Sequence, residues 1–214
     1  MSDRYDPPKD EIAVLHADHE LLVVEKPAGL LSVPGKGPEL ADSLIARLAQ
    51  AFPQVLLVHR LDRDTSGVMV FALTPHAQRH LGLQFEKRQV KKTYIARVAG
   101  RVSESKGTVD LPLMVDWPNR PLQKVDPEGR AALTDWHRVK ASDAESRMRL
   151  LPKTGRSHQL RVHMLALGHP ILGDPLYAPD TAPAFPRMML HAEELRLRHP
   201  DGGAGQVFRA KAPF

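Results

Sequence analysis

Val68-Met69-Val70-Phe71-Ala72-Leu73 is an uninterrupted apolar run, and Thr74-Pro75 follows it directly. Gly67 bounds the run at its start, and these limits are typical of a β-strand. Thr74 fits the N-cap of a helix and Pro75 fits its first position, so the sequence predicts a helix that ends near Arg88. This stretch therefore predicts a strand that is followed directly by a capped helix.

Short apolar and β-branched runs predict further strands on both sides of this stretch, at residues 12–15, 21–26, 93–98, 132–139, 148–151, 190–198 and 207–209. Helical spacing predicts two more helices, over residues 40–52 and 157–167, the second ended by Gly168. Residues 99–130 are expected to be mostly loop. Several strands with a few interspersed helices indicate an α+β fold rather than a βαβ series.

The composition narrows the class of protein. A chain of 214 residues that is 42% apolar fits one globular domain with a proper core. The absence of cysteine excludes disulfides, thiolate zinc sites, iron–sulfur clusters and a cysteine nucleophile. No apolar run approaches the ~20 residues of a membrane span, and the first ten residues are polar. We therefore expect a cytoplasmic protein that makes no membrane contact.

The charge is basic, with 30 Lys and Arg against 25 Asp and Glu, a net charge of +5. Arginine outnumbers lysine, 19 to 11, and its planar guanidinium binds phosphate through two parallel hydrogen bonds. This excess favours a polyanionic partner such as RNA. An ordinary solvated basic surface explains the same numbers, so charge alone does not decide.

The stretch His59-Arg60-Leu61-Asp62-Arg63-Asp64-Thr65-Ser66-Gly67 places two arginines and two aspartates in one polar loop. A carboxylate beside guanidinium groups stays ionised, which makes it a candidate nucleophile or base. A turn closed by ion pairs explains the same residues through ordinary turn chemistry. Both interpretations stay open from the residue types.

Two later stretches combine basic or hydrogen-bond-donating side chains with a tyrosine or histidine ring. In Lys91-Lys92-Thr93-Tyr94, the tyrosine could stack on a base while the lysines hold phosphates, although a half-buried strand tyrosine is commoner. From Thr154 to Pro170, donors gather before and in the first turn of a predicted helix, which suits an anion. The three histidines there lack the spacing of a helical zinc pair, so we expect no metal and a packed His163.

Together these stretches resemble the RluA family of RNA pseudouridine synthases. The resemblance rests on the loop from His59 to Gly67, the strand from Lys92 to Val98, the run Gly155-Arg156-Ser157-His158-Gln159-Leu160-Arg161-Val162-His163 and the upstream run from Lys26 to Gly35. They occur in the family's order, and the match extends from about Ile12 to the C-terminus. It implies one catalytic domain over residues 1–214 without a separate N-terminal RNA-binding module. The implied fold is α+β, with a mixed, largely antiparallel central sheet flanked by helices and loops, and a catalytic cleft.

The resemblance also implies a role for individual residues. Asp62 is the expected catalytic carboxylate, which either attacks the ribose or removes a proton from its 2′ carbon. Tyr94 is expected to stack on the uracil, Arg161 to pair with Asp62, and Arg60 to fill the space left by a flipped nucleotide. Residues expected to hold the RNA backbone are Lys91, Lys92, Arg88, Arg156 and Lys124. No cofactor and no metal is expected, and the expected state is a monomer.

The chain length and the loop Asp116-Trp117-Pro118-Asn119-Arg120-Pro121 resemble family members with dual specificity. Such members modify a uridine of 23S rRNA and one in the anticodon stem–loop of certain tRNAs; another rRNA or tRNA uridine is the alternative. Two other classes remain to be weighed. One is an RNA-binding module without catalysis, and the other is a glycosidase or nuclease that uses Asp62 and Asp64.

Overall fold

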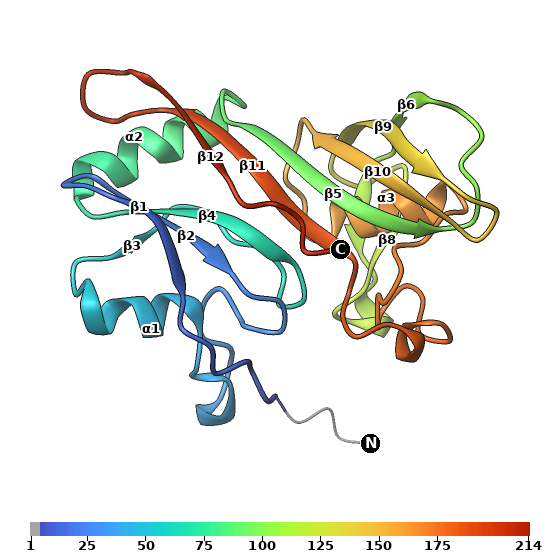
Figure 1. The fold of residues 1–214 in the computed structure, drawn as a ribbon, viewed down its shortest axis with the longest axis horizontal. Helices are drawn as coiled ribbons and strands as arrows, with labels where there is room; N and C mark the ends of the chain where they lie inside the picture. The colour runs from blue at the N-terminus through green and yellow to red at the C-terminus, as the bar shows by residue number, and fades with distance from the viewer. Residues whose placement is uncertain (1–4) are drawn as a thin grey trace. The chain divides into compact units, whose positions relative to one another are not determined.

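The computed structural model describes residues 5–214, and the chain divides into two compact units (Figure 1). Unit 1 contains the residues up to Lys91 together with Ala192–Pro213, and unit 2 contains Lys92–His191 with Phe214. The chain passes from one to the other within β5 (Lys91–Ala99) and returns within β11 (Leu190–Arg198). The expected single catalytic domain stays a prediction. No helix within residues 5–214 is long and apolar enough to cross a membrane.

Unit 1 is a sheet covered by two helices. Its strands are β1 (Ala13–Ala17), β2 (Leu21–Lys26), β3 (Leu56–Leu57), β4 (Ser66–Ala72), most of β11 and β12 (Gly205–Arg209). Their order is β1-β2-β4-β11, with β3 on β4 and β12 on β11. The helices are α1 (Leu44–Ala51) and α2 (Pro75–Glu86).

Both faces of β2 and β4 are buried, because apolar residues occupy nearly every position. On one face Val23 and Val70 pack with Leu81 of α2. The alternate residues Leu22 and Phe71, also fully buried, point to the other face. Figure 1 shows α1 and α2 on opposite sides of these strands, so each helix covers one face.

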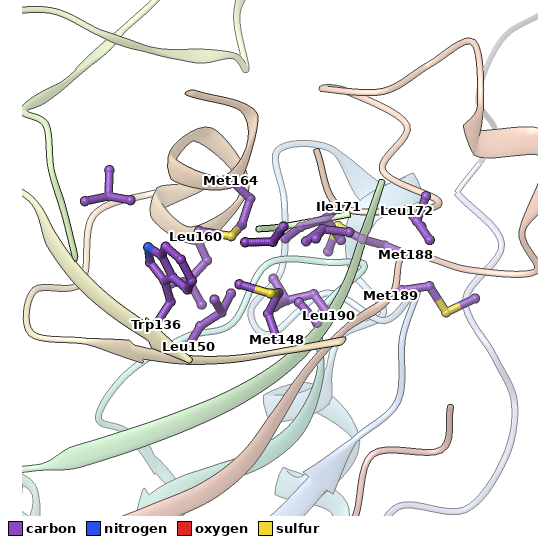
Figure 2. Close-up of a cluster of buried hydrophobic side chains, with 14 residues drawn as sticks. Trp136, Met148, Leu150, Leu160, Met164, Ile171, Leu172, Met188, Met189 and Leu190 are labelled. Atoms are coloured by element: carbon purple, nitrogen blue, oxygen red, sulfur yellow. The ribbon is translucent and has the colours of Figure 1, made fainter. Parts of the chain in front are cut away.

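Unit 2 contains an antiparallel sheet in the order β5-β10-β9-β6 and one helix, α3 (Gln159–Ala166). Its strands are β6 (Lys106–Asp110), β9 (Leu133–Ala141), β10 (Glu145–Pro152) and β5. A separate hairpin pairs β7 (Leu113–Val115) with β8 (Gln123–Val125). Figure 2 shows the core beneath α3, where Leu160 and Met164 meet Trp136, Met148 and Leu150. One face of this sheet therefore packs on α3 and the other does not contribute to that core.

The α+β expectation is confirmed. The strand pairs β1–β2, β2–β4, β3–β4, β11–β12, β5–β10, β10–β9 and β9–β6 are all antiparallel. Short 3₁₀ turns lie at Pro38–Leu40, Trp117–Asn119 and Ala182–Ala184. Two local predictions need correction. The helix predicted from residue 40 begins at Leu44, because Ser43 accepts a hydrogen bond from the Ala46 N–H and caps it there. The helix predicted from residue 157 begins at Gln159, because His158 adopts a left-handed conformation with φ 54°. Residues 99–130 are mostly loop, as predicted, with the short strands β6, β7 and β8 among them.

Candidate active site

The predicted carboxylate, Asp62, lies in unit 1 in the loop of residues 58–65 that joins β3 to β4. Asp62 is partly exposed, whereas Leu61 beside it is buried. The Asp62 carbonyl accepts a hydrogen bond from the Thr65 N–H, at 3.2 Å, which closes a tight turn. The residues on both sides of Asp62 are held by the run from Lys26 to Gly35.

Ser32 fixes the residue that precedes Asp62. Its hydroxyl donates to the Leu61 carbonyl at 2.7 Å and accepts from the Leu61 N–H at 3.2 Å. Ser32 is buried, so these two bonds are shielded from water. The sequence showed this serine only as part of a motif, with no signal that it reaches a loop 29 residues away.

Lys26 fixes the residue that follows Asp62. Its side chain is completely buried, and Nζ donates to the carbonyls of Arg63, Pro27 and Leu30 at 2.8, 2.8 and 2.6 Å. The Gly29 N–H donates to the same Arg63 carbonyl at 2.9 Å. A buried ammonium needs such acceptors because it has left water behind. The loop around Asp62 is therefore tied to β2 as well as to β4.

Two further contacts shape this loop. The Val70 N–H donates to His59 Nε2 at 3.1 Å, and the His59 ring stacks on Phe85 of α2 with centroids 4.7 Å apart. Gly67, at φ 115°, lies so close to the Ala192 backbone that a Cβ atom would collide with its carbonyl oxygen. Only glycine fits there.

The charged neighbours of Asp62 differ in their surroundings. Arg63 binds Asp64 through two hydrogen bonds, Nε to Oδ1 at 2.9 Å and Nη2 to Oδ2 at 3.2 Å. Arg60 is exposed, and the structure describes no ion-pair partner for it among residues 5–214. Asp64 is thus engaged by its own neighbour, which weakens the hydrolase interpretation that requires two working carboxylates.

The other predicted side chains lie in unit 2, apart from the exposed Lys91 and Arg88 of unit 1. Tyr94 is on β5 and packs against the core beneath α3. Lys92 donates from Nζ to the Thr154 carbonyl at 3.3 Å, and burial lowers the pKa of its ammonium. This bond places Lys92 beside Gly155 and so next to the loop that carries Arg156.

Gln159 organises the loop before α3. Its Oε1 accepts from the Thr154 hydroxyl at 2.7 Å and from the Arg156 N–H at 3.0 Å, while Nε2 donates to the Leu133 carbonyl. The Arg156 side chain donates to the Ala131 carbonyl. The donors predicted to lie in the first helical turn therefore bind protein oxygens here. Lys124, on β8, is exposed and pairs with Asp126 at 3.0 Å, which raises the pKa of Lys124.

Arg161 of α3 is almost completely buried and is held by a residue that the sequence did not single out. Its Nε and Nη2 donate to the two carboxylate oxygens of Asp174 at 2.7 and 2.6 Å. The Tyr177 ring lies 5.0 Å from the guanidinium carbon. One carboxylate thus holds the edge of the guanidinium while a ring covers its face.

Asp174 and Tyr177 belong to one turn. Asp174 Oδ1 also accepts from the backbone N–H groups of Leu176 and Tyr177 at 2.9 and 3.1 Å. The Tyr177 hydroxyl accepts from the Gln123 N–H at 2.9 Å and hydrogen-bonds His158 Nδ1 at 2.8 Å. The turn therefore links Arg161 to the β7–β8 hairpin and to the left-handed residue before α3.

His163 is fully buried on α3, as its sequence context predicted. Its Nδ1 hydrogen-bonds the Thr134 hydroxyl at 2.9 Å and its Nε2 hydrogen-bonds the Leu111 carbonyl at 3.0 Å. Burial lowers the pKa of this imidazole, against the smaller opposing effects of the Leu111 carbonyl and Asp110. No group of three His, Asp or Glu side chains within residues 5–214 is arranged to hold a metal ion.

Comparisons with known proteins identify the family. The pattern of the family described as RNA pseudouridylate synthase matches residues 20–166. The dual-specificity RNA pseudouridine synthase RluA of Escherichia coli K12 is 52% identical over 99% of both chains, and that of Vibrio cholerae is 51% identical over 92% of this chain and 81% of its own. The solved structure of human RNA pseudouridylate synthase domain containing 1 has a TM-score of 0.80 and 30% identity, covering 98% of this chain and 87% of its own. The chain therefore belongs to the RNA pseudouridylate synthase family.

Proposed function

We propose that this protein isomerises uridine to pseudouridine in structured RNA. The observation that carries the proposal is the 52% identity to the E. coli dual-specificity RNA pseudouridine synthase over almost the whole of both chains. Those relatives are described as dual-specificity enzymes, and the resemblance of the sequence motifs implies 23S rRNA and tRNA anticodon stem–loops as the two substrates. We also propose the cytoplasm as the location and a monomer as the working state. Another rRNA or tRNA uridine is the alternative target.

The reaction breaks the bond between ribose C1′ and uracil N1 and joins C1′ to uracil C5. The proton lost from C5 is balanced by the proton gained at N1, so the mass of the RNA does not change. No atom is oxidised by an external acceptor, and we therefore expect no redox cofactor. The chemistry requires a carboxylate at the sugar and a surface that holds the detached base while it turns.

We assign the carboxylate role to Asp62. Two routes are consistent with it, attack on C1′ or removal of the proton on C2′. The bonds from Ser32 and Lys26 to its neighbours support the assignment, because a reacting group must be held within a fraction of an ångström of its target. A flexible loop would lose much of that advantage.

Three further roles follow. Tyr94 stacks on the uracil, and its hydroxyl can carry a proton late in the reaction. Arg161 pairs with the catalytic carboxylate, as the resemblance implies. Arg60 replaces the flipped nucleotide in its stack, for which an exposed and cationic planar group is suited. The backbone is held by the basic residues named above, Lys91, Lys92, Arg88, Arg156 and Lys124.

The test of Asp62 is Asp62→Asn. The variant should form no pseudouridine in a target stem–loop, while its RNA affinity stays within about tenfold of the wild type, or about 1.4 kcal/mol. Mapping modified uridines in total RNA from cells with and without the protein identifies the target. Undiminished turnover in the variant would refute the assignment, and a wild type that binds RNA without turnover would make the protein a binding module. Release of free uracil or chain cleavage would indicate a hydrolase.

Tyr94→Phe separates stacking from proton transfer. The ring is retained, so we expect RNA affinity to be kept and turnover to slow. Single-turnover kinetics on the same stem–loop measure the difference. Full activity would remove the hydroxyl from the mechanism.

A further inference from the structure

The sheet of unit 2 has one face without a helix, and basic side chains gather on it. In β10, Met148 and Leu150 point into the core beneath α3, so Arg147 and Arg149 between them point to the opposite face. Arg149 is exposed and Arg147 is half-buried. Tyr94 and α3 lie on the core side, so this opposite face is separate from the catalytic residues proposed in unit 2.

Strand pairing assembles the cations into two rows. In the first row Arg97 lies opposite Arg147, and Arg147 lies opposite Lys140. In the second row Arg149 lies opposite His137, and His137 lies opposite Lys106. A register shift beyond Arg147 turns His137 and Lys140 to the same face although they are three positions apart. We call these six residues the basic face: Arg97, Lys106, His137, Lys140, Arg147 and Arg149.

The carboxylates on this side pair with only some of the cations. Glu145 forms an ion pair with Arg97, with Nη2 and Oε2 2.6 Å apart. Asp135 forms an ion pair with Lys153, with Nζ and Oδ2 2.9 Å apart. Within residues 5–214 the structure describes no ion pair for Lys106, Lys140 or Arg149. The five lysines and arginines of the basic face, with Lys153 beside them, make six cations against three carboxylates, Glu145, Asp135 and Asp110. The side-chain charge on this side is therefore 6 − 3 = +3, against a net +5 for the chain.

Like charges in directly opposed positions destabilise a sheet, so rows of cations are unfavourable unless an anion binds them. The rows also border a hollow of about 390 Å³, which Arg97, Arg147 and Lys140 line together with the Phe214 ring. Arg147 donates to the Phe214 carbonyl and its guanidinium lies 5.8 Å from that ring. A cationic hollow beside an aromatic ring suits a phosphate that carries a sugar or base.

We propose that the basic face is a second RNA-binding surface, which holds the sugar–phosphate backbone of the substrate outside the stem–loop that contains the target uridine. The proposal rests on the proposed function, because its partner is the RNA substrate. RNA is favoured over an acidic protein because the cations form a regular array rather than surrounding an apolar patch. Four strands spaced about 4.8 Å apart span about 14 Å, wide enough for several consecutive backbone groups.

The test compares two substrates and two variants with equal loss of charge. The first variant, Lys106→Ala/Lys140→Ala/Arg149→Ala, removes exposed side chains outside the proposed catalytic machinery. The control, Lys36→Ala/Arg79→Ala/Lys87→Ala, removes three exposed cations of unit 1. Both are measured with a stem–loop that holds the target uridine and with the same stem–loop extended by one helical turn of duplex.

We expect the first variant to bind and modify the short stem–loop within about twofold of the wild type. Its Kd for the extended RNA should rise about tenfold or more, and the log–log dependence of that Kd on salt should fall by about two to three units, since each lost phosphate contact removes about 0.9. Equal losses in the control variant, or a wild type that gains nothing from the extension, would overturn the proposal. An extended RNA that binds as expected but is never modified would refute the proposed function and leave the surface intact.

Discussion

Asp174→Asn tests how the buried arginine of α3 is held. The substitution keeps the shape of the side chain but removes the charge that binds Arg161, which is 2% exposed. Breaking one side of a buried ion pair costs about 3–5 kcal/mol. The Asn oxygen can still accept from the Leu176 and Tyr177 N–H groups, whereas its amide nitrogen would meet a guanidinium N–H donor to donor. We therefore expect a loss near the lower limit, about 3 kcal/mol.

Urea unfolding measures this loss through the fluorescence of the buried Trp136. With a slope of about 2 kcal/mol per molar urea, the midpoint should fall by about 1.5 M. The matched control is Asp143→Asn, which removes an exposed carboxylate that pairs with Arg101 at 2.9 Å in the same unit. Exposed pairs contribute about 0–1 kcal/mol, so its midpoint should hardly move.

The same variant separates positioning from folding. At temperatures where it stays folded, kcat for pseudouridine formation should fall while KM changes little, because the guanidinium then loses its fixed direction. Asp174→Glu, which restores the charge on a longer stem, should recover part of kcat. An Asp174→Asn protein whose unfolding midpoint and kcat match those of Asp143→Asn would refute the reasoning.

Three further outcomes are expected. Lys26→Met removes a donor from three carbonyls, of which that of Arg63 keeps another, the Gly29 N–H, and should cost at least about 2 kcal/mol in the free energy of unfolding; an unchanged melting temperature would contradict the anchoring of the Asp62 loop. Arg60→Ala should leave the free energy of unfolding within about 0.5 kcal/mol and slow turnover more on a paired stem–loop than on an unstructured RNA; equal slowing on both would refute the wedge role. Because burial lowers the pKa of His163, its contribution to stability is present above the unfolded pKa and lost as the pH falls; the difference in urea midpoint between wild type and His163→Gln should therefore shrink from pH 7.5 to pH 5, and a difference that grows would contradict the sign.

The elements that sequence reasoning located well are those with local signals. The buried run before Thr74 forms β4, and the Thr74 hydroxyl accepts from the Ala77 N–H at 3.0 Å as an N-cap must. Residues 99–130 lacked such signals, because β6 gains its partner, β9, from more than twenty residues away. Each strand of the β7–β8 hairpin has only three residues, and the Gln123 N–H at the start of β8 donates to the Tyr177 hydroxyl. Short strands stabilised by distant partners leave little periodicity in the sequence.

The start of α3 shows a local rule overridden by tertiary contacts. The hydrogen-bond donors at residues 154–158 fitted the first turn of a helix. In the structure the Thr154 hydroxyl and the Arg156 N–H instead donate to Oε1 of the Gln159 side chain. His158 adopts a left-handed backbone conformation, which is uncommon outside glycine. Its ring hydrogen-bonds the Tyr177 hydroxyl. The helix therefore begins later than its pattern indicates.

The candidate site divides in the same way. The charged loop from His59 to Gly67 is visible in the sequence, but the family resemblance, not the residue types, singled out Asp62. The groups that hold this loop act across 29 and 37 residues. Asp174 had even less to distinguish it, since a lone aspartate after glycine is ordinary turn chemistry. Only the fold shows that its carboxylate faces Arg161.

These anchors lead us to expect that the residues around Asp62 and Arg161 are costly to change even where they touch no substrate. In unit 1 a buried ammonium and a buried hydroxyl each hydrogen-bond the backbone on one side of Asp62, so a shift of the loop breaks a buried hydrogen bond of each. In unit 2 Arg161 is satisfied by a turn whose own N–H groups share the same carboxylate oxygen. In each unit the penalty for an unpaired buried group converts a flexible segment into a fixed one. If Asp62 and Arg161 act as proposed while the base is detached and turned, this penalty is what keeps the carboxylate and the guanidinium in position.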